Sequence, residues 1–227
     1  MGRDRLPRKR PIRADALRNR RHILVAAREL FAERGLAVSL DQVAHKAALG
    51  VGTVYRHFST KQDLIHDAFE DVLADLVSHA EAAAVNPDPW QGIVEFFDAA
   101  FEYAAPDRGL AQLLIVTHDD LRETRDSLEA ALVRLIERAR AAGAVRDGVG
   151  IGDLYVLTVM IDAVGERVSP IDPDAWRRYL DLALDGLRAD GTPRHRIRGR
   201  APKLDEIHAV QRSSSDPERK GAVDHRV

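Results

Sequence analysis

"SLDQVAHKAALGVGTVYRHF", residues 39–58, predicts two short helices joined by a tight turn. Apolar residues recur at three- and four-residue spacing over 40–47 and again over 51–57, which is the period of one helix face. Ser39 with Gln42 fits a capping box, in which side chain and backbone donors at a helix start satisfy one another. The stretch therefore predicts a helix-turn-helix, a motif that lays its second helix in the major groove of DNA.

The segments before this stretch predict a third helix and a basic arm. Apolar residues share one face over roughly 16–34, Asp15 has the side chain of a helix N-cap, and Gly35 is free to adopt the left-handed conformation that ends a helix. Residues 1–14 contain two prolines and several basic residues, so we expect a disordered basic arm there. Residues 15–63 together predict a three-helix DNA-binding domain.

The rest of the chain predicts an all-helical regulatory domain over residues 64–189, which makes the fold class all-α. Ser59 and Gln62 fit a second capping box, and from Thr60 an apolar stripe continues for about 25 residues, or about 38 Å, enough to link two domains. Residues 190–227 lack a sustained apolar period, so we expect a disordered tail. Further helices are expected from Trp90 to near Pro106 and over about 107–117, 119–142, 152–168 and 173–189.

Composition is that of a soluble globular protein. Of the 227 residues, 45% are hydrophobic and 31% are charged, which allows a substantial core. No run of roughly 18 apolar residues occurs and no apolar segment follows the basic N-terminus, so we expect neither a transmembrane helix nor a signal peptide, and a cytoplasmic location. The sequence has no cysteine, which excludes disulfides, thiolate metal sites and cysteine nucleophiles.

The net charge of −2 hides a strong division along the chain. Residues 1–63 carry 14 Lys and Arg against 6 Asp and Glu, residues 64–189 carry 11 against 24, and residues 190–227 carry 9 against 6. A basic N-terminal segment suits binding to a polyanion such as DNA, whereas an acidic segment such as 64–189 does not. Basic arms are also common as solubilising tails, so charge alone leaves both interpretations open.

The second helix of the motif and its flanks hold the side chains suited to DNA. Gly50 and Gly52 let the backbone at the start of this helix come close to a phosphate. Arg56 has the shape to bond a guanine in bidentate fashion, although it can equally be a solvated charge, and Tyr55 can equally be a packing residue. The residues expected to contact DNA are Ser39, Gly50, Val51, Gly52, Thr53, Tyr55, Arg56, His57 and Lys61.

This region resembles the N-terminal domain of the TetR family of bacterial transcriptional regulators. The resemblance covers residues 15–75, with "ILVAARELFAERG" before the motif and the pattern Tyr-x-His-Phe-x-x-Lys at 55–61. It implies that the Tyr, His and Lys of this pattern contact the DNA backbone and that residues 50–56 read bases. Ala48 departs from the family, which often has glycine in the turn. Because alanine occupies most turn geometries, we expect the fold to be kept.

The acidic half resembles the family's regulatory domain in length and helix content. Such domains dimerise through two C-terminal helices, and "DLYVLTVMIDAV" followed by "DAWRRYLDLALDGL" fits that position. The resemblance implies a homodimer on a palindromic operator, although the same helices can be the core of a monomer. It also implies a cavity for an unknown small-molecule effector. The candidate cavity residues, most of which can equally be core, are Trp90, Phe97, Phe101, Tyr103, Leu113, Thr117, His118 and Tyr155.

No pattern in the sequence favours an enzyme, a metal site or a cofactor. His118, Asp119 and Asp120 are consecutive, and consecutive residues of a helix point in different directions, so two acids at a helix start are the better interpretation. We expect a repressor that a small molecule releases from its operator. The alternatives are a helical small-molecule-binding or enzymatic protein with an incidental basic front, and a DNA-binding repressor that takes no ligand.

Overall fold

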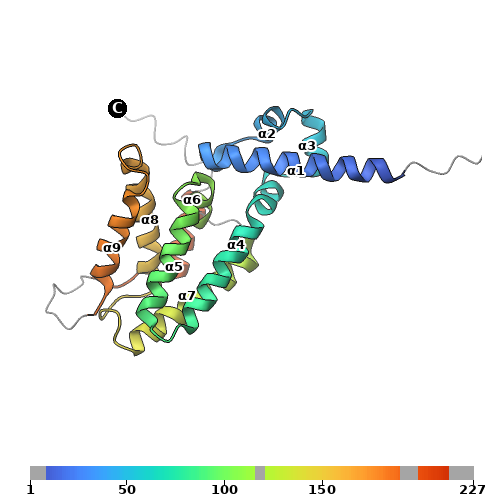
Figure 1. The fold of residues 1–227 in the computed structure, drawn as a ribbon. Helices are drawn as coiled ribbons and strands as arrows, with labels where there is room; N and C mark the ends of the chain where they lie inside the picture. Colours follow the sequence, from blue (N-terminus) through green and yellow to red (C-terminus); the bar gives the residue numbers. More distant parts are fainter. Residues whose placement is uncertain (1–8, 116–120, 190–198, 215–227) are drawn as a thin grey trace, which may run out of the picture.

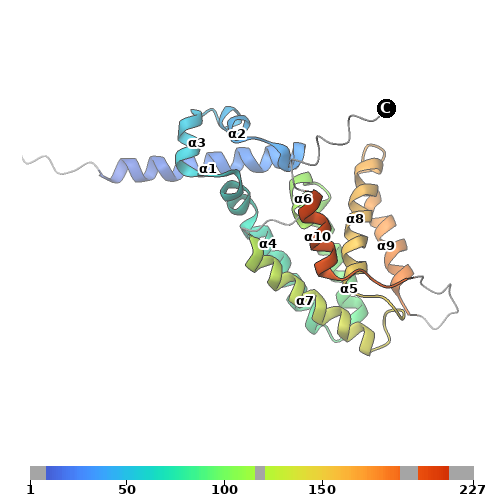
Figure 2. The ribbon, with the colours of Figure 1, turned by 180° about the vertical axis from the view of Figure 1, so that it is seen from behind.

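The computed structural model describes residues 9–115, 121–189 and 199–214, and within these ranges the fold is all-α, as expected. Helices α1–α3 form one unit, α4 leads from it into the bundle of α5–α9 (Figure 1), and α10 lies against α8 on the opposite side (Figure 2). None of the described helices has the length and apolar character needed to cross a bilayer. The elements are α1 (Lys9–Arg34), the 3-10 turn η1 (Gly35–Ala37), α2 (Leu40–Lys46), α3 (Val51–His57), α4 (Lys61–Val85), α5 (Pro89–Ala104), α6 (Arg108–Ile115), α7 (Arg122–Ala141), α8 (Ile151–Val168), α9 (Ala175–Leu187) and α10 (Leu204–Ser214).

A shared apolar core holds α1, α2 and α3 together. Ile23, Phe31, Val43 and Val54 are fully buried, and Phe58 directly after α3 is nearly so. Burying one such side chain contributes about 1.5–3 kcal/mol. The cluster is continuous with the core of the helical bundle, so the DNA-facing unit and the bundle are packed as one body of buried residues.

Helices α4, α5 and α7 form a tightly packed frame. A Cβ atom on Gly92 would lie 2.6 Å from the carbonyl oxygen of Ala83, so the approach of α5 to α4 requires glycine. Arg138 of α7 donates to the carbonyl oxygens of Ala84 and, at 2.8 Å, of Asn86. These carbonyls end α4, where no intrahelical partner exists, so α7 caps α4 while packing on it.

Helix α1 begins at Lys9 rather than after Asp15, which corrects the expected extent of the disordered arm. Pro11 lies in the first turn, where backbone N–H groups have no intrahelical partner, so the proline does not interrupt the helix. Asp15 therefore lies inside the helix and pairs with Arg18 one turn later. The end of α1 is as expected, because Gly35 has a φ of +71°.

The second capping box forms one residue later than expected. Thr60, not Ser59, is the N-cap of α4: its hydroxyl accepts a hydrogen bond from the Asp63 amide at 3.0 Å, and the Asp63 carboxylate accepts one from the Thr60 amide at 2.9 Å. Aspartate thus takes the role that the motif usually gives to Glu or Gln. The correction makes Lys61 the first residue of α4.

Residues 199–214, expected to belong to a disordered tail, contain helix α10. Ile207 is buried, and a Cβ atom on Gly152 of α8 would lie 1.9 Å from the carbonyl oxygen of Pro202, so the segment leading into α10 presses directly on α8. Leu204 and Ile207 share a face over a single turn, too short for a period to stand out in the sequence. The remaining parts of the arm and tail, 1–8, 190–198 and 215–227, lie outside the described residues.

Candidate nucleic-acid interface and ligand cavity

Helices α2 and α3 form the expected helix-turn-helix. The Ser39 hydroxyl accepts from the Gln42 amide at 3.3 Å, and the Gln42 side chain accepts from the Ser39 amide at 2.9 Å, which confirms the first capping box. In the turn, the Leu49 amide donates to the carbonyl of Ala44 at 3.0 Å. Ala48 has a φ of +54°, a region that L-residues avoid. The helix-turn-helix is kept with alanine at this position, as expected, although the turn has the geometry that glycine usually provides.

One face of α3 is buried and the other is open. Val54 packs into the core, whereas Val51 is 43% and Tyr55 is 50% exposed. A Cβ atom on Gly52 would meet no atom within 4 Å. Gly52 is the second residue of α3, where glycine costs less than the about 0.5–1 kcal/mol it costs in the middle of a helix, but the packing of this chain still gives no reason for glycine at this position. The open face leaves the backbone of α3 accessible to a large partner.

The polar side chains around α3 are held in defined positions. Arg56 donates from Nε to the carbonyl of Gly52 at 3.0 Å and from Nη2 to the Thr53 hydroxyl at 3.1 Å, so its guanidinium folds back along α3. Burial lowers the pKa of Lys61 below its usual range, and a nearby phosphate would favour the charged form again. None of the nine residues expected to contact DNA is buried, and Thr53, His57 and Lys61 are half-buried.

Arginines fix α1 onto α4 just behind this surface. Arg20 pairs with Asp67, and its guanidinium carbon lies 4.8 Å from the centre of the Phe58 ring. Arg28 donates from Nε to the carbonyl of Ala68 at 2.6 Å. The position of α3 relative to α4 is therefore set by ion pairs and a cation–π contact as well as by the apolar core.

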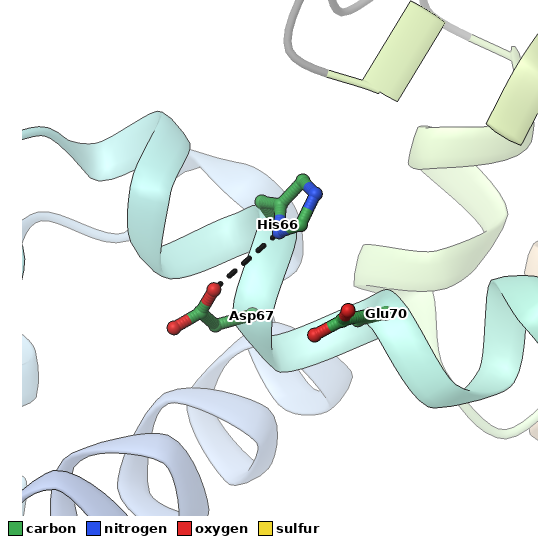
Figure 3. Close-up of side chains that lie close together, drawn as sticks. All are labelled: His66, Asp67 and Glu70. Atoms are coloured by element: carbon green, nitrogen blue, oxygen red, sulfur yellow. Dashed lines mark hydrogen bonds and ion pairs between the residues drawn. The ribbon is translucent and has the colours of Figure 1, made fainter. Parts of the chain in front are cut away.

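His66, Asp67 and Glu70 lie close together on α4 (Figure 3), with ligand atoms within 4.8 Å of one another. His66 Nδ1 is 3.4 Å from Asp67 Oδ1. These side chains are of the types that bind divalent cations, and the sequence analysis did not single them out. Because Arg20 already pairs with Asp67 and all three residues come from consecutive turns of one helix, we assign the group to the joint between α1 and α4.

A mostly apolar cavity of about 130 Å³ lies inside the bundle, with walls from α4 to α8 and from α10. Three of the expected ligand-binding residues line it: Phe97, Leu113 and Tyr155. Phe101 instead lines a second cavity of about 220 Å³ between α5, α6, α8 and the start of α9. Lining residues of the first cavity that sequence reasoning missed include Leu73, Leu76, Phe96, Leu128, Glu129, Leu154, Thr158, Leu204 and His208.

Two expected ligand-binding residues line neither cavity. Trp90 is buried and lies under the guanidinium of Arg188, 5.4 Å from the ring centre. Tyr103 packs beside the ring of His79, with ring centres 6.4 Å apart. Both aromatic side chains therefore contribute to packing in this structure. The other two, Thr117 and His118, lie with Asp119 and Asp120 outside the described residues.

Helix α6 lies between the cavities and the DNA-facing unit. Leu113 lines the first cavity and the neighbouring Gln112 lines the second. The side-chain oxygen of Gln112 accepts a hydrogen bond from the Leu36 amide at 2.7 Å, directly after α1. A Cβ atom on Gly109 would lie 2.8 Å from the Cβ atom of Phe31, so α6 and α1 touch without intervening side chains. A shift of α6 therefore reaches α1 directly.

Two protein-family models match the chain. The model described as bacterial regulatory proteins, tetR family, matches residues 23–68, and the model described as transcriptional regulator SbtR-like, C-terminal domain, matches residues 88–189. The chain belongs to the TetR family of transcriptional regulators. The first match contains the helix-turn-helix described above. The second ends before α10.

Individual relatives agree with membership of the TetR family. A TetR transcription regulatory protein from Mycobacterium vanbaalenii is 33% identical over 78% of this chain and 99% of that chain, with a TM-score of 0.45. NalD of Pseudomonas aeruginosa, described as the secondary repressor of the MexAB-OprM multidrug efflux pump, is 22% identical over 77% and 99%, with a TM-score of 0.51, and shares the fold. HTH-type transcriptional regulators of Staphylococcus aureus are 36% identical over 69 residues, which cover 30% of this chain and 37% of theirs.

Proposed function

We propose that this TetR-family protein is a repressor that binds a palindromic operator as a homodimer and releases it when a small molecule occupies the cavity of the bundle. It would act in the bacterial cytoplasm, where the chromosome is accessible. A protein that covers operator DNA competes with other proteins for the same site, so repression is the simplest consequence of binding.

The observation that carries the DNA-binding role is Gly52. Its neighbours leave open space around it, its helix would be more stable with alanine, and it lies between two exposed side chains, Val51 and Tyr55. A glycine that the fold does not need, on the exposed face of a helix-turn-helix, is explained by a partner whose surface approaches the backbone closely. The basic balance of residues 1–63 indicates that this partner is a polyanion.

Exposed apolar side chains on α8 and α9 support the homodimer. Met160 is 55% and Leu182 58% exposed, and Val156 and Tyr179 lie one turn from them at 39% each. Apolar residues at three- and four-residue spacing on two packed helices form a continuous face that water disfavours. The same face on a second copy buries it by two-fold symmetry, and this symmetry matches a palindrome.

Two helices connect the cavity to the DNA-facing unit and support release by an effector. Leu73 and Leu76 of α4 line the cavity, and the same helix begins beside α3. Helix α6 lines both cavities and bonds to Leu36 through Gln112. A ligand that prefers one arrangement of these helices shifts the population towards it, and DNA then binds less tightly by the same coupling energy.

The test starts with selection of a bound site from random duplex DNA, which should return a palindrome with two half-sites about one helical turn or slightly more apart. Operator affinity is then measured for Gly52→Ala. We expect this variant to be at least as stable as the parent protein in denaturant unfolding and to bind the operator at least tenfold more weakly.

Gly165→Ala is the matched control, because Gly165 lies inside α8 and an added Cβ atom would make only an ordinary 3.9 Å contact with Trp176. The control should gain about 0.5–1 kcal/mol of stability, because Gly165 lies well inside its helix, and should keep full operator affinity. Unchanged affinity in Gly52→Ala would remove the argument from the open face of α3. Sequence-blind binding in the selection would favour the alternative of a small-molecule-binding or enzymatic protein with an incidental basic front.

A further inference from the structure

Helix α10 forms part of the wall of the apolar cavity. Leu204 and His208 are part of the cavity wall, and Ile207 between them is buried. His208 Nε2 lies 2.8 Å from Glu129 Oε1 on α7, which also lines the cavity. The match to the TetR-family C-terminal domain ends at residue 189, so this part of the wall comes from beyond the matched domain.

Helix α10 makes few buried contacts with the rest of the protein, unlike the helices of the core. Its side chains are described up to Ala209, and within that range Ile207 is the only buried one. The Glu129–His208 pair is about one-quarter exposed, so solvent weakens it. Segments held by few buried apolar contacts open far more readily than the continuous core.

We infer that α10 is an opening lid, and that the cavity under it takes a compact, mostly apolar molecule the size of one substituted benzene ring with a hydrogen-bond donor directed at Glu129. This inference rests on the proposed effector-binding role. A dry cavity of about 150 Å³ lined by Leu, Ile and Phe accommodates benzene, and this cavity has a similar lining and a volume of about 130 Å³.

The polar groups of the wall define the polar end of the ligand, and Arg125 among them already has an interaction partner. The full set is Thr124, Arg125, Glu129, Tyr155, Thr158 and His208. The hydroxyls of Tyr155 and Thr158 donate to backbone carbonyl oxygens at 2.5 and 3.1 Å, so their hydrogens are already used. Glu129 pairs with His208 through Oε1. A carboxylate has a second oxygen, which accepts a further hydrogen bond. A phenolic hydroxyl or an amine on the ligand supplies the donor that this oxygen requires, next to the lid.

Calorimetric titration of the full chain with three probes tests the ligand class. The probes are 4-ethylphenol, its methyl ether 4-ethylanisole, which has no donor, and 4-phenylphenol, which has a second ring. We expect 4-ethylphenol to bind at least tenfold more tightly than either of the others, since the ether has no donor for the partly buried carboxylate of Glu129 and the second ring exceeds the cavity volume. Equal affinity for the ether overturns the assignment of the polar end, and no binding of 4-ethylphenol overturns the ligand class.

Three full-length variants test the lid. His208→Ala removes the ion pair, and Ile207→Asp removes the buried contact. In each we expect affinity for 4-ethylphenol to fall at least fivefold and the preference over 4-phenylphenol to shrink by a similar factor, because an open lid admits the larger ring. Asp205→Asn, on the exposed side of α10, is the control and should match the parent protein. Unchanged preference in His208→Ala overturns the lid even where Ile207→Asp fails to fold.

Operator binding of the same samples without probe separates this inference from the proposed function. Full operator affinity in a protein that ignores 4-ethylphenol overturns the ligand class and leaves the DNA-binding role standing. Loss of sequence-specific DNA binding in the parent protein, with normal probe binding, contradicts the proposed function while supporting the lid and its ligand.

Discussion

Replacing Ala48 by glycine should stabilise the protein. Ala48 has a φ of +54° between α2 and α3, where the Cβ atom of an L-residue crowds the following carbonyl oxygen at a cost of about 1–2 kcal/mol. Glycine removes this cost but loses more backbone freedom on folding, an offset of about 0.5–1 kcal/mol. The side chain of Ala48 is exposed, so its methyl group contributes little packing. The net gain in the free energy of unfolding is about 0.5–1 kcal/mol, or about 1–4 °C in melting temperature.

The neighbouring alanine provides a control of opposite sign. Ala47 has a φ of −75° and its methyl group packs against the core, so Ala47→Gly should lower stability by at least about 0.5–1 kcal/mol. Urea unfolding followed by circular dichroism measures both variants, and an unchanged slope shows that the unfolding reaction is the same. A loss of stability in Ala48→Gly comparable to that in Ala47→Gly would refute the strain argument. Operator affinity of Ala48→Gly should stay within about threefold of the parent, since the turn geometry is kept.

Three further outcomes follow from the site and its supports. Lys61→Ala should weaken binding to all DNA sequences alike and reduce the salt dependence by about one phosphate contact, measured by fluorescence anisotropy across a salt series; an unchanged slope would remove its phosphate role. Gln112→Ala leaves the Leu36 amide without its acceptor and should cost about 1 kcal/mol of stability while reducing the loss of operator affinity on ligand binding. Burial raises the pKa of Asp162, so as the pH falls the folded chain binds a proton at this carboxyl at a higher pH than the unfolded chain does. The contribution of Asp162 to the free energy of unfolding therefore becomes more favourable as the pH falls. Asp162→Asn should therefore melt higher than the parent near pH 7.5, by a margin that narrows as the pH is lowered towards the ordinary aspartate pKa of 3.8; a constant margin contradicts this.

Features that depend on neighbours within four residues were predictable from the sequence. The Ser39–Gln42 box and the end of α1 at Gly35 are local hydrogen-bonding and backbone effects, and both are present. The N-cap of α4 was predicted one residue too early because Ser59 and Thr60 both have side chains that can cap a helix. Thr60 is the N-cap because Asp63, three residues later, completes the capping box with it. The strain at Ala48 was not predictable, because composition of a turn does not fix its φ.

Features that join distant parts of the chain were not predictable from one sequence. The cavity wall combines residues from α4 to α10, and the Glu129–His208 pair that closes it has no local signature. The Gln112 bond to Leu36 likewise links residues of different domains. Apolar periodicity identifies a buried face but not which helix covers it, so the sequence could not show that Phe97 lines the cavity and Trp90 does not. Only the packing of the folded chain shows which of the two lines the cavity.

In the proposed mechanism, the geometry of α4 would let a small movement at the cavity release DNA. Leu76 lines the cavity 15 residues after Lys61, a distance of about 22 Å along the helix. A tilt of about 5° about Leu76 moves the start of α4, and α3 beside it, by about 2 Å. Hydrogen bonds weaken steeply over a few tenths of an ångström, and in a symmetric dimer both recognition helices move, so the spacing error doubles. Because α6 and α1 touch at Gly109, we propose that displacement of α6 by a ligand would be transmitted to the DNA-facing unit, and that α4 would convert it into a change of half-site spacing.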